Sequence, residues 1–472
     1  MTANASVIRA LAPIASIEGG ALRVTNEAAM ASSQMDALAR LAVFGNESER
    51  HAARWAIWEL GQAVGVRSWS IHELYLARGK GKCHGFTVPA INVRGRAYDT
   101  ARAIFRTAIK LNAGAFILEI ARSEIAYTEQ RPAEYVAVML AAALREGFRG
   151  PVFIQGDHFQ VNAKKYAGDA AKEVGDVKHL ATEAVHAGFY NIDIDTSTLV
   201  DLSKSTLDEQ QRLNYEVGVD ITRHVRSLQP KGVDISLGGE IGEVGTENST
   251  VPELRAYMDG YNRTLAAQAP GMEGLSKISV QSGTSHGGVV LADGSIADVK
   301  LDFNTLQALG EEARKSYGLA GAVQHGASTL PETAFHNFPK TETAEIHLAT
   351  GFQNMLYDLI PAALREEMYA WLRVNAAEER KAGDSDEQFI YKTRKKALGP
   401  FKEKLWAVGG AEAAAIDRAF DQKFEFLFTQ LGAGGTAPHV ANFVKTAPTH
   451  RAAPVEGASG MVAAPDDPDA GE

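Results

Sequence analysis

The sequence predicts an α/β fold, a (β/α)8 TIM barrel with an N-terminal helical extension and C-terminal helices. Three observations lead to this fold. Between about residues 71 and 375, short apolar runs alternate with helix-length patterns. Eight such runs occur, which is the strand number of the barrel. Polar residues gather where these runs end. A doubly wound open sheet is the alternative, and the position of the polar residues favours the barrel.

The eight expected strands are short and mostly apolar, as buried parallel strands are. They span residues 86–92, 115–121, 152–158, 190–195, 235–241, 277–283, 319–326 and 344–350. Helical patterns such as 97–114 and 133–147 lie between most of them, as crossover connections require.

The chain divides into three parts by composition. Residues 1–70 are Ala-rich and read as a helical N-terminal extension, with 47–65 as its clearest amphipathic segment. Residues 71–432 hold the barrel and its C-terminal helices. Residues 433–472 are rich in Gly, Ala, Pro and Thr, which is typical of a flexible tail.

Charge and cysteine content narrow the class of protein. The net charge of −10 argues against a general nucleic-acid binder, because phosphate-backbone binding needs a basic surface. The single cysteine, Cys83, excludes a disulfide within the chain and a Cys-rich zinc site. No run approaches the roughly 18 apolar residues of a membrane span. These features favour a cytoplasmic protein with neither a nucleic-acid nor a membrane partner.

Polar residues cluster at the carboxyl ends of the expected strands. In a barrel these ends converge on one mouth, where active sites lie, whereas a set of solvated loops would scatter polar residues over both ends. The residues are Asn92, Glu119, Asp157, His158, Asp193, Asp195, Glu240, Ser282, His325 and His347.

Three histidines stand at equivalent places in the motifs GDH, SHGG and QHGAS. His158, His286 and His325 each follow a different strand, with glycine beside or near them. Three imidazoles from three strands can share one divalent metal and leave positions open for a substrate. The neighbouring Gly287 and Gly326 would expose backbone N–H groups to an anion, and Ser328 adds a hydroxyl, a combination that suits phosphate.

With these motifs in order, the chain resembles the class II, metal-dependent fructose-bisphosphate and tagatose-bisphosphate aldolases. The likeness runs from about Ser70 to Val408. It rests on PAIN, the Asp-His pair, GGEIGEVG, SHGGV, QHGAS, a threonine after the eighth strand, and the late segment IYKTRKKALGPFKEKL.

The resemblance implies a role for each matching residue. His158, His286 and His325 match the ligands of the catalytic metal, usually zinc, although manganese, cobalt or iron would also suit imidazoles. Glu240 and Asp195 match acids of an outer or alternative ion position. Asp157 matches the carboxylate that handles the substrate hydroxyl proton. Positions that match substrate or phosphate contacts are Asn92, Gly287, Gly326, Ser328, Thr350 and Arg394.

The implied chemistry is cleavage of a ketose 1,6-bisphosphate, such as fructose 1,6-bisphosphate, into dihydroxyacetone phosphate and glyceraldehyde 3-phosphate. A metal chelated by the ketone and the adjacent hydroxyl would stabilise the enediolate as a Lewis acid. Asp157 would remove the C4 hydroxyl proton. The competing Schiff-base route needs a lysine, and the candidate strands offer only Lys277, at the wrong end.

Three departures from the family pattern concern the residues that recognise the substrate. Of two successive glutamates after the fifth strand, Glu247 remains as a candidate catalytic residue and Asn248 replaces the second. The usual Asn-x-Asp-Thr after the eighth strand reads HLAT, so His347 and Ala349 replace two orienting residues, and His347 becomes a candidate catalytic group. The loop after the second strand, normally rich in small residues, carries Arg122 and Glu124.

These departures leave other functions open. A metal-dependent epimerase or isomerase of a sugar phosphate or sugar acid would use the same machinery, as would an aldolase on another phosphorylated ketose. A non-catalytic binding protein would have no need for the three histidines and Asp157. By analogy with the family, we expect a homodimer or a larger homo-oligomer.

Overall fold

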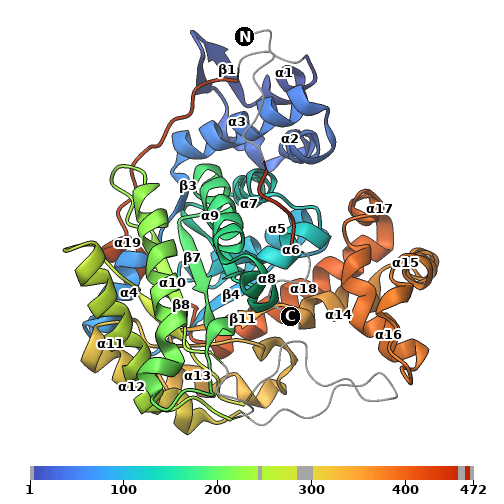
Figure 1. Cartoon of the computed structure of the whole chain (residues 1–472). Helices are drawn as coiled ribbons and strands as arrows, with labels where there is room; N and C mark the ends of the chain where they lie inside the picture. Colours follow the sequence, from blue (N-terminus) through green and yellow to red (C-terminus); the bar gives the residue numbers. More distant parts are fainter. Residues whose placement is uncertain (1–4, 243–246, 284–300, 455–462, 468–472) are drawn as a thin grey trace.

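The computed structural model contains the predicted barrel, closed and parallel throughout (Figure 1). It describes residues 5–242, 247–283, 301–454 and 463–467. Within these ranges, eight parallel strands form a ring in chain order, closed by pairing of the last with the first. They are β4 (Val88–Asn92), β5 (Ile117–Ala121), β6 (Gly150–Gln160), β7 (Asn191–Asp195), β8 (Ser236–Glu240), β9 (Lys277–Ser279), β10 (Ala322–Gln324) and β11 (Glu345–Leu348). Each expected strand is confirmed.

Helices surround the ring and cover its outer face, so the strands are buried on both sides. Every residue of β4, β5 and β7 is buried, which explains why these strands read as continuous apolar runs. The helices between the strands are α5 (Ala97–Lys110), α6 (Arg122–Tyr127), α7 (Pro132–Glu146), α8 (Ala163–Gly168), α9 (Ala170–Ala187), α10 (Leu207–Ser227), α11 (Val251–Gln268), α12 (Phe303–Tyr317) and α13 (Asn337–Lys340), with short 3-10 turns η2 (Ser197–Leu199), η3 (Ala327–Thr329) and η4 (Glu332–Ala334).

Local sequence signals set the ends of several helices. The side chain of Thr206 accepts a hydrogen bond from the Glu209 N–H, and Glu209 in turn accepts from the Thr206 N–H, a capping box that starts α10. Pro132 opens α7, where its missing N–H costs nothing, and Gly147 ends that helix with φ +77°, a conformation that disfavours other residues.

The N-terminal extension is mainly helical and is joined to the barrel by a strand that the sequence did not predict. That strand, β3 (Val66–Trp69), pairs in parallel with residues 150–153 of β6. A small antiparallel hairpin, β1 (Ala15–Glu18) and β2 (Ala21–Val24), also departs from the all-helical expectation. The helices are α1 (Ala5–Leu11), the turn η1 (Glu27–Ala31), α2 (Ser33–Phe44), α3 (Glu47–Val64) and, after β3, α4 (His72–Gly79).

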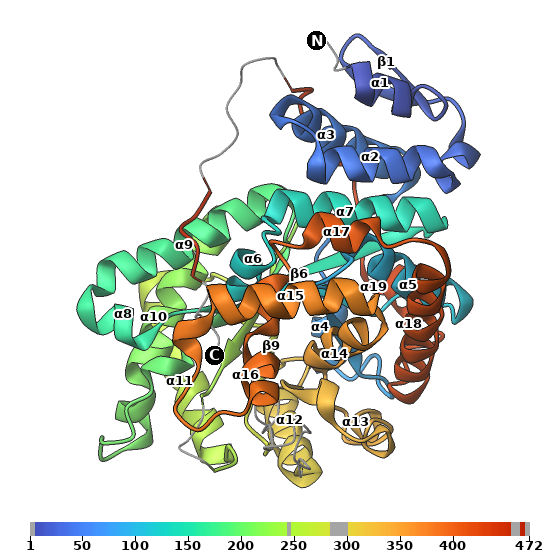
Figure 2. The ribbon, with the colours of Figure 1, turned by 90° about the vertical axis from the view of Figure 1, so that its right-hand side faces the viewer.

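The C-terminal helices gather on one side of the barrel (Figures 1 and 2). They are α14 (Thr350–Leu359), α15 (Ala362–Asn375), η5 (Ala377–Glu379), α16 (Asp386–Thr393), η6 (Arg394–Ala397), α17 (Lys402–Ala407) and α18 (Gly410–Gln430). Aromatic contacts bind α18 to α14, for example Phe352 with Phe424 at 5.1 Å between ring centroids.

The segment predicted as a tail includes helix α19 (Ala437–Phe443) and a stretch that contacts the N-terminal extension. The indole N–H groups of Trp55 and Trp58 donate to the carbonyl oxygens of Arg451 and Thr449, at 3.0 and 2.6 Å. The Arg451 guanidinium lies 3.4 Å from the centroid of the Trp58 ring. These contacts hold residues 449–451 against α3, so this part is fixed in place. The three-part division of the chain stays a prediction.

Among the described residues, no helix combines the length and apolar character that crossing a membrane requires.

Two glycines without close neighbours allow the cost of backbone conformation to be measured separately from packing. A Cβ placed on Gly147 or on Gly175, which lies within α9, would meet no atom within 4 Å. Gly147→Ala should lower the free energy of unfolding by about 1 kcal/mol, because φ +77° is strained for alanine. Gly175→Ala should raise it by about 0.5–1 kcal/mol, because alanine favours helix. Urea denaturation measures both, and shifts of the same sign would contradict this explanation.

Candidate active site

Alternation along the strands places pairs of polar side chains inside the barrel. Residues two apart in a strand face the same side of a sheet. Polar residues at this spacing therefore lie one above the other, in a lower layer and in an upper layer nearer the mouth. The pairs are Gln155 with Asp157 on β6, Asp193 with Asp195 on β7, and Glu345 with His347 on β11, all of them buried.

Lys277 is the centre of the lower layer. Its ammonium group donates to Glu345 Oε1 at 2.5 Å, Gln155 Oε1 at 2.8 Å and Asp193 Oδ2 at 2.9 Å. Burial by itself lowers the pKa of Lys277, but the carboxylates of Asp193 and Glu345 outweigh burial and raise that pKa above its usual value. Although Lys277 begins its strand, its long side chain reaches up the barrel. Because the amine is held protonated in ion pairs, it is not available as a Schiff-base nucleophile.

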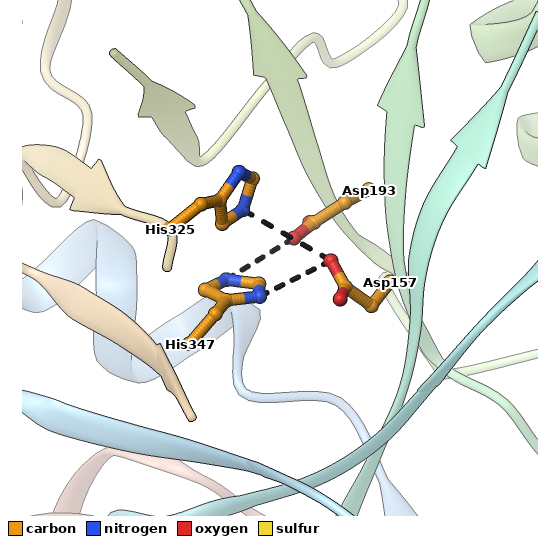
Figure 3. Close-up of side chains that lie close together, drawn as sticks. All are labelled: Asp157, Asp193, His325 and His347. Atoms are coloured by element: carbon orange, nitrogen blue, oxygen red, sulfur yellow. Dashed lines mark ion pairs between the residues drawn. The ribbon is translucent and has the colours of Figure 1, made fainter. Parts of the chain in front are cut away.

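Above Lys277, the imidazole of His347 contacts four carboxylates, those of Glu119, Asp157, Asp193 and Glu345. Its Nε2 is 2.7 Å from Glu345 Oε1, and its Nδ1 is 3.0 Å from Glu119 Oε2 and 3.1 Å from Asp157 Oδ1. Figure 3 shows His347 and His325 facing Asp157 and Asp193 across the barrel. Burial opposes protonation of His347, but the negative charges of Glu119 and Asp157 outweigh it and hold its pKa well above the usual value.

A second group of donors, His158, Glu240 and His325, lies beside this one. One donor atom from each lies within 4.8 Å of the others. Nδ1 of His158 is 3.1 Å from Asp195 Oδ2 and 3.6 Å from Glu240 Oε2, and Nδ1 of His325 is 3.7 Å from the same Glu240 oxygen. The His158 and His325 rings are 4.2 Å apart between centroids.

Burial and neighbouring charges shift the pKa values of Glu240 and His158 in this group. Burial, and next the charge of Asp195, raise the pKa of Glu240 to about 8. Burial opposes protonation of His158, but Asp157, Asp195 and Glu240 outweigh it and raise the pKa of the ring well above its usual value. The protein thus concentrates several carboxylates around imidazoles in a closed space.

This donor set fits a divalent metal ion. Two imidazoles and one carboxylate are ligands that zinc and related ions accept, and their donor atoms converge at a spacing that one ion can span. Asp195, which accepts from Gln160 and Ser197 and faces His158 Nδ1, would orient that ring from behind. His286, the third predicted histidine, lies outside the described residues, as does Gly287.

An irregularity in β6 brings both Asp157 and His158 to the cluster. In a regular strand these neighbours would face opposite sides. Here the pairing of β6 with β7 shifts register between Gly156 and Phe159, and His158 has φ +40°, which is strained for a residue with a side chain. As a result Asp157 Oδ1 and His158 Nε2 lie 3.7 Å apart.

The predicted phosphate positions at the ends of β10 and β11 lie together. Gly326, with φ +66°, precedes η3, which contains Ser328. Thr350 begins the ten-residue helix α14, and the N–H of Gly351 donates to Ser328 Oγ at 3.1 Å. A Cβ on Gly351 would be 2.6 Å from the Ser328 carbonyl oxygen, so only glycine permits this approach. A helix N-terminus beside a hydroxyl is a suitable anion site.

The two remaining substrate candidates occupy different places. Arg394 is nearly buried, bonds to Asn354 of α14 and stacks over Tyr391 at 4.4 Å. Asn92, at the end of β4, donates to Glu124 Oε2 at 2.5 Å, and the guanidinium of Arg94 contacts the other Glu124 oxygen at 2.5 Å.

Glu247, predicted as catalytic, is exposed and has no described contact with the cluster. Conversely, several residues of the buried polar network were not predicted from the sequence. They are Gln155, Lys277, Glu345 and Arg94, together with Glu119 and Asp193, which were predicted at strand ends but without a role. The signal that could have found most of them is a charged or amide side chain two positions from another polar residue in an apolar strand.

A closed parallel barrel with histidine and carboxylate side chains at the carboxyl ends of its strands defines a (β/α)8 protein with an enzyme-like centre. The sequence model of class II fructose-bisphosphate aldolases matches residues 78–406. The chain belongs to this family, and the membership supports an aldolase, a carbon–carbon lyase. No match was found among curated protein sequences.

The solved structures that resemble this chain are all of low sequence identity. A probable tagatose 6 phosphate kinase from Sinorhizobium meliloti 1021 is 18% identical with a TM-score of 0.51, covering 77% of this chain and 95% of its own. A fructose-bisphosphate aldolase from Campylobacter jejuni is 17% identical, with a TM-score of 0.47 and coverages of 79% and 98%. A putative fructose-1,6-biphosphate aldolase from Coccidioides immitis is 16% identical, with a TM-score of 0.43 and coverages of 78% and 96%. At these identities the likeness concerns the fold alone, and of these three the Sinorhizobium structure supports it.

Removing the buried ammonium of Lys277 should be costly. Lys277→Met removes the buried ammonium that contacts both Asp193 and Glu345 and should lower the free energy of unfolding by about 3–5 kcal/mol. The matched control is Lys315→Met, since Lys315 forms an exposed pair with Glu311 at 2.8 Å and its loss should cost less than about 1 kcal/mol. Urea denaturation compares the two, and equal losses would refute the central role of Lys277.

Proposed function

We propose that the protein is a metal-dependent aldolase that cleaves and forms a ketose 1,6-bisphosphate, with fructose 1,6-bisphosphate as the first substrate to test. The observation that carries this proposal is the convergence of His158, Glu240 and His325 directly beside the Asp157 carboxylate. Family membership over residues 78–406 supports the same reaction. The resident ion is zinc in this proposal, with manganese, cobalt and iron compatible with the same donors.

Asp157 acts as the base in this reaction. It accepts the C4 hydroxyl proton, the C4–O bond becomes the carbonyl of glyceraldehyde 3-phosphate, and the C3–C4 bond breaks. The bonding electron pair passes to the ketone side, and return of a proton to C3 completes dihydroxyacetone phosphate. The metal, when bound, supplies Lewis-acid stabilisation of the negative charge that develops there. His347, 3.1 Å from Asp157, holds the carboxylate in place.

Two separate groups of residues are candidates for the substrate phosphates. Gly326, Ser328 and Thr350 form one anion site at the start of α14, which we assign to the phosphate on the dihydroxyacetone half. Arg394 is the candidate for the other phosphate, and Asn92 for a hydroxyl contact. Glu247 stays a candidate for proton exchange at C3. Assembly into a homodimer or larger oligomer, and a cytoplasmic location, belong to the same proposal.

His347 favours a second candidate function, epimerisation or isomerisation of a sugar phosphate or sugar acid. An imidazole and a carboxylate in contact can move a proton between two positions of one substrate. Such an enzyme would rearrange its substrate without releasing triose phosphate. An aldolase on another phosphorylated ketose would instead release triose phosphate from that ketose but not from fructose 1,6-bisphosphate.

Cleavage is tested by supplying fructose 1,6-bisphosphate and divalent metal and detecting triose phosphates with coupled dehydrogenases. Asp157→Ala should retain metal yet lower turnover by about 10²-fold or more, because the base is lost. Asp176→Asn, on the surface of α9, serves as the control and should keep full turnover. Absence of triose phosphate from metal-loaded wild-type protein would refute the proposal for this substrate.

Metal content gives a separate test of the site. His325→Ala should reduce bound zinc from about one ion per chain to a trace, because one of few ligands is lost. The control is His186→Ala, an exposed histidine on α9 whose ring bonds to the Thr182 carbonyl. Elemental analysis after dialysis measures both proteins. An unchanged zinc content in His325→Ala would remove His325 from the metal site.

A further inference from the structure

The irregular end of β6, which holds His158, is supported by a buried group of charges around Arg122. The guanidinium of Arg122, the first residue of α6, donates through Nη1 to the Gln160 carbonyl oxygen at 2.6 Å. The same nitrogen is 2.6 Å from Glu173 Oε1, which also accepts from the backbone N–H of Asn162 at 2.9 Å. Two backbone groups just beyond His158 are thus held by one ion pair.

The residues held by this ion pair contact Asp195, which in turn faces the candidate metal ligand His158. The Gln160 side chain donates to Asp195 Oδ2 at 2.7 Å, and this oxygen faces His158 Nδ1 at 3.1 Å. The N–H of Val161 donates to the Asp195 carbonyl at 2.8 Å. Because regular ladder pairing is interrupted before Phe159 and His158 has φ +40°, these bonds replace the ladder as support for a strained backbone.

The C-terminal segment Ala463–Asp467 completes this group of charges from outside the barrel. The Ala464 N–H donates to Glu183 of α9 at 2.9 Å, and Asp466 pairs with Arg131 at 2.7 Å. Asp467 then reaches Arg122 Nη2 at 3.3 Å and Lys165 Nζ at 2.8 Å. The segment is drawn in red where it crosses α9 in Figure 2.

Charge balance explains why Asp467 matters. Arg122 and Lys165 carry two positive charges, Glu173 and Asp467 two negative ones, so the group is neutral only with the C-terminal segment in place. The side chains of Arg122 and Asp467 are 2% and 1% exposed, so water compensates neither. Without Asp467 the buried pair of Arg122 and Glu173 stays neutral and Lys165 is solvated, but Arg122 Nη2 loses its carboxylate partner. The cost of a buried donor without its acceptor favours a shift of the guanidinium, and with it of the contact to the Gln160 carbonyl.

We propose that Ala463–Asp467 is a strap and that Asp467 is a positioning residue, which through Arg122 and Gln160 fixes the backbone of His158 in its metal-binding geometry. The inference rests on the proposed metal site, and assigns to the C-terminal end of the chain a part in building it. Asp467 touches no reacting atom. It acts through two intervening residues.

Adjacent aspartates provide a matched pair for the test. Asp467→Ala removes the buried carboxylate, whereas Asp466→Ala removes a carboxylate whose side chain is 62% exposed. Cobalt(II) titration of the metal-free full chain should show affinity about tenfold weaker for Asp467→Ala, as for other groups that orient metal ligands. Asp466→Ala should stay within about twofold of wild type. Equal affinities for Asp467→Ala and wild type would overturn the proposal.

Chemical rescue separates charge compensation from general damage. Acetate can occupy the space left by the Asp467 side chain, so adding it should restore cobalt affinity to Asp467→Ala, while chloride at equal ionic strength should not. Lys165→Ala, which removes a partly exposed partner, should weaken cobalt binding in the same direction but less. If Asp467→Ala does not fold, Lys165→Ala replaces it in the test. A cobalt affinity of Lys165→Ala equal to that of wild type would then overturn the strap proposal.

Amide hydrogen exchange in metal-free protein tests the strap independently of the metal. Exchange at residues 158–162 should be faster in Asp467→Ala and unchanged in Asp466→Ala. If wild-type protein binds no stoichiometric cobalt, the proposed metal function fails, while this comparison still decides whether the strap supports β6. Identical exchange in both variants and wild type would overturn the strap, even if the metal site is real.

Discussion

The neutralisation of charge inside the closed barrel is the constraint on which the rest of the site depends. Glu119, Asp157, Asp193 and Glu345 are all buried where water cannot solvate them, and unpaired carboxylates in such a place would be far too costly. The ammonium of Lys277 contacts Asp193 and Glu345 from below, and the imidazole of His347 contacts all four. Burial, and next the charge of Asp157, raise the pKa of Glu119 to about 8, so a proton on Glu119 and the two cations together offset most of this negative charge. His158, Glu240 and His325 lie directly beside this layer, next to Asp157.

The position of His347 links this layer to the family's chemistry. A neutral asparagine is usual there, and the replacement by histidine coincides with the buried carboxylate Glu119 at 3.0 Å. An imidazole with a raised pKa carries positive charge, which an amide cannot, so the histidine compensates negative charge that the amide would leave unbalanced. In this chain His347 therefore both offsets the charge of Glu119 and Asp157 and stands among the groups that would face a substrate.

The strands, their order and the mouth of the barrel could be predicted from the sequence. The alternation of apolar runs with helical patterns, and the polar residues at the ends of these runs, are local signals. His158, Asp157 and His325 were found for the same reason, since each belongs to a short motif with glycine. Lys277 was misjudged because the sequence shows where a strand begins but not how far a side chain reaches. The hairpin and β3 were hidden in an Ala-rich region whose composition favours helix. The contacts of Asp467 join residues more than 300 positions apart, as with Arg122, and no local pattern can indicate such a pairing.

The added strand β3 makes the N-terminal extension part of the barrel's hydrogen-bonded framework. Its four residues occupy the side of β6 below the point where β7 begins to pair, and the Asn191 side chain donates to the Trp69 carbonyl to complete the join. A chain that began after residue 70 would leave residues 150–153 of β6 as an open sheet edge with unpaired N–H and C=O groups, and such edges recruit strands from other molecules. The extension thus protects the barrel against edge-to-edge aggregation. A shortened protein would keep all its active-site residues but would be expected to be less soluble.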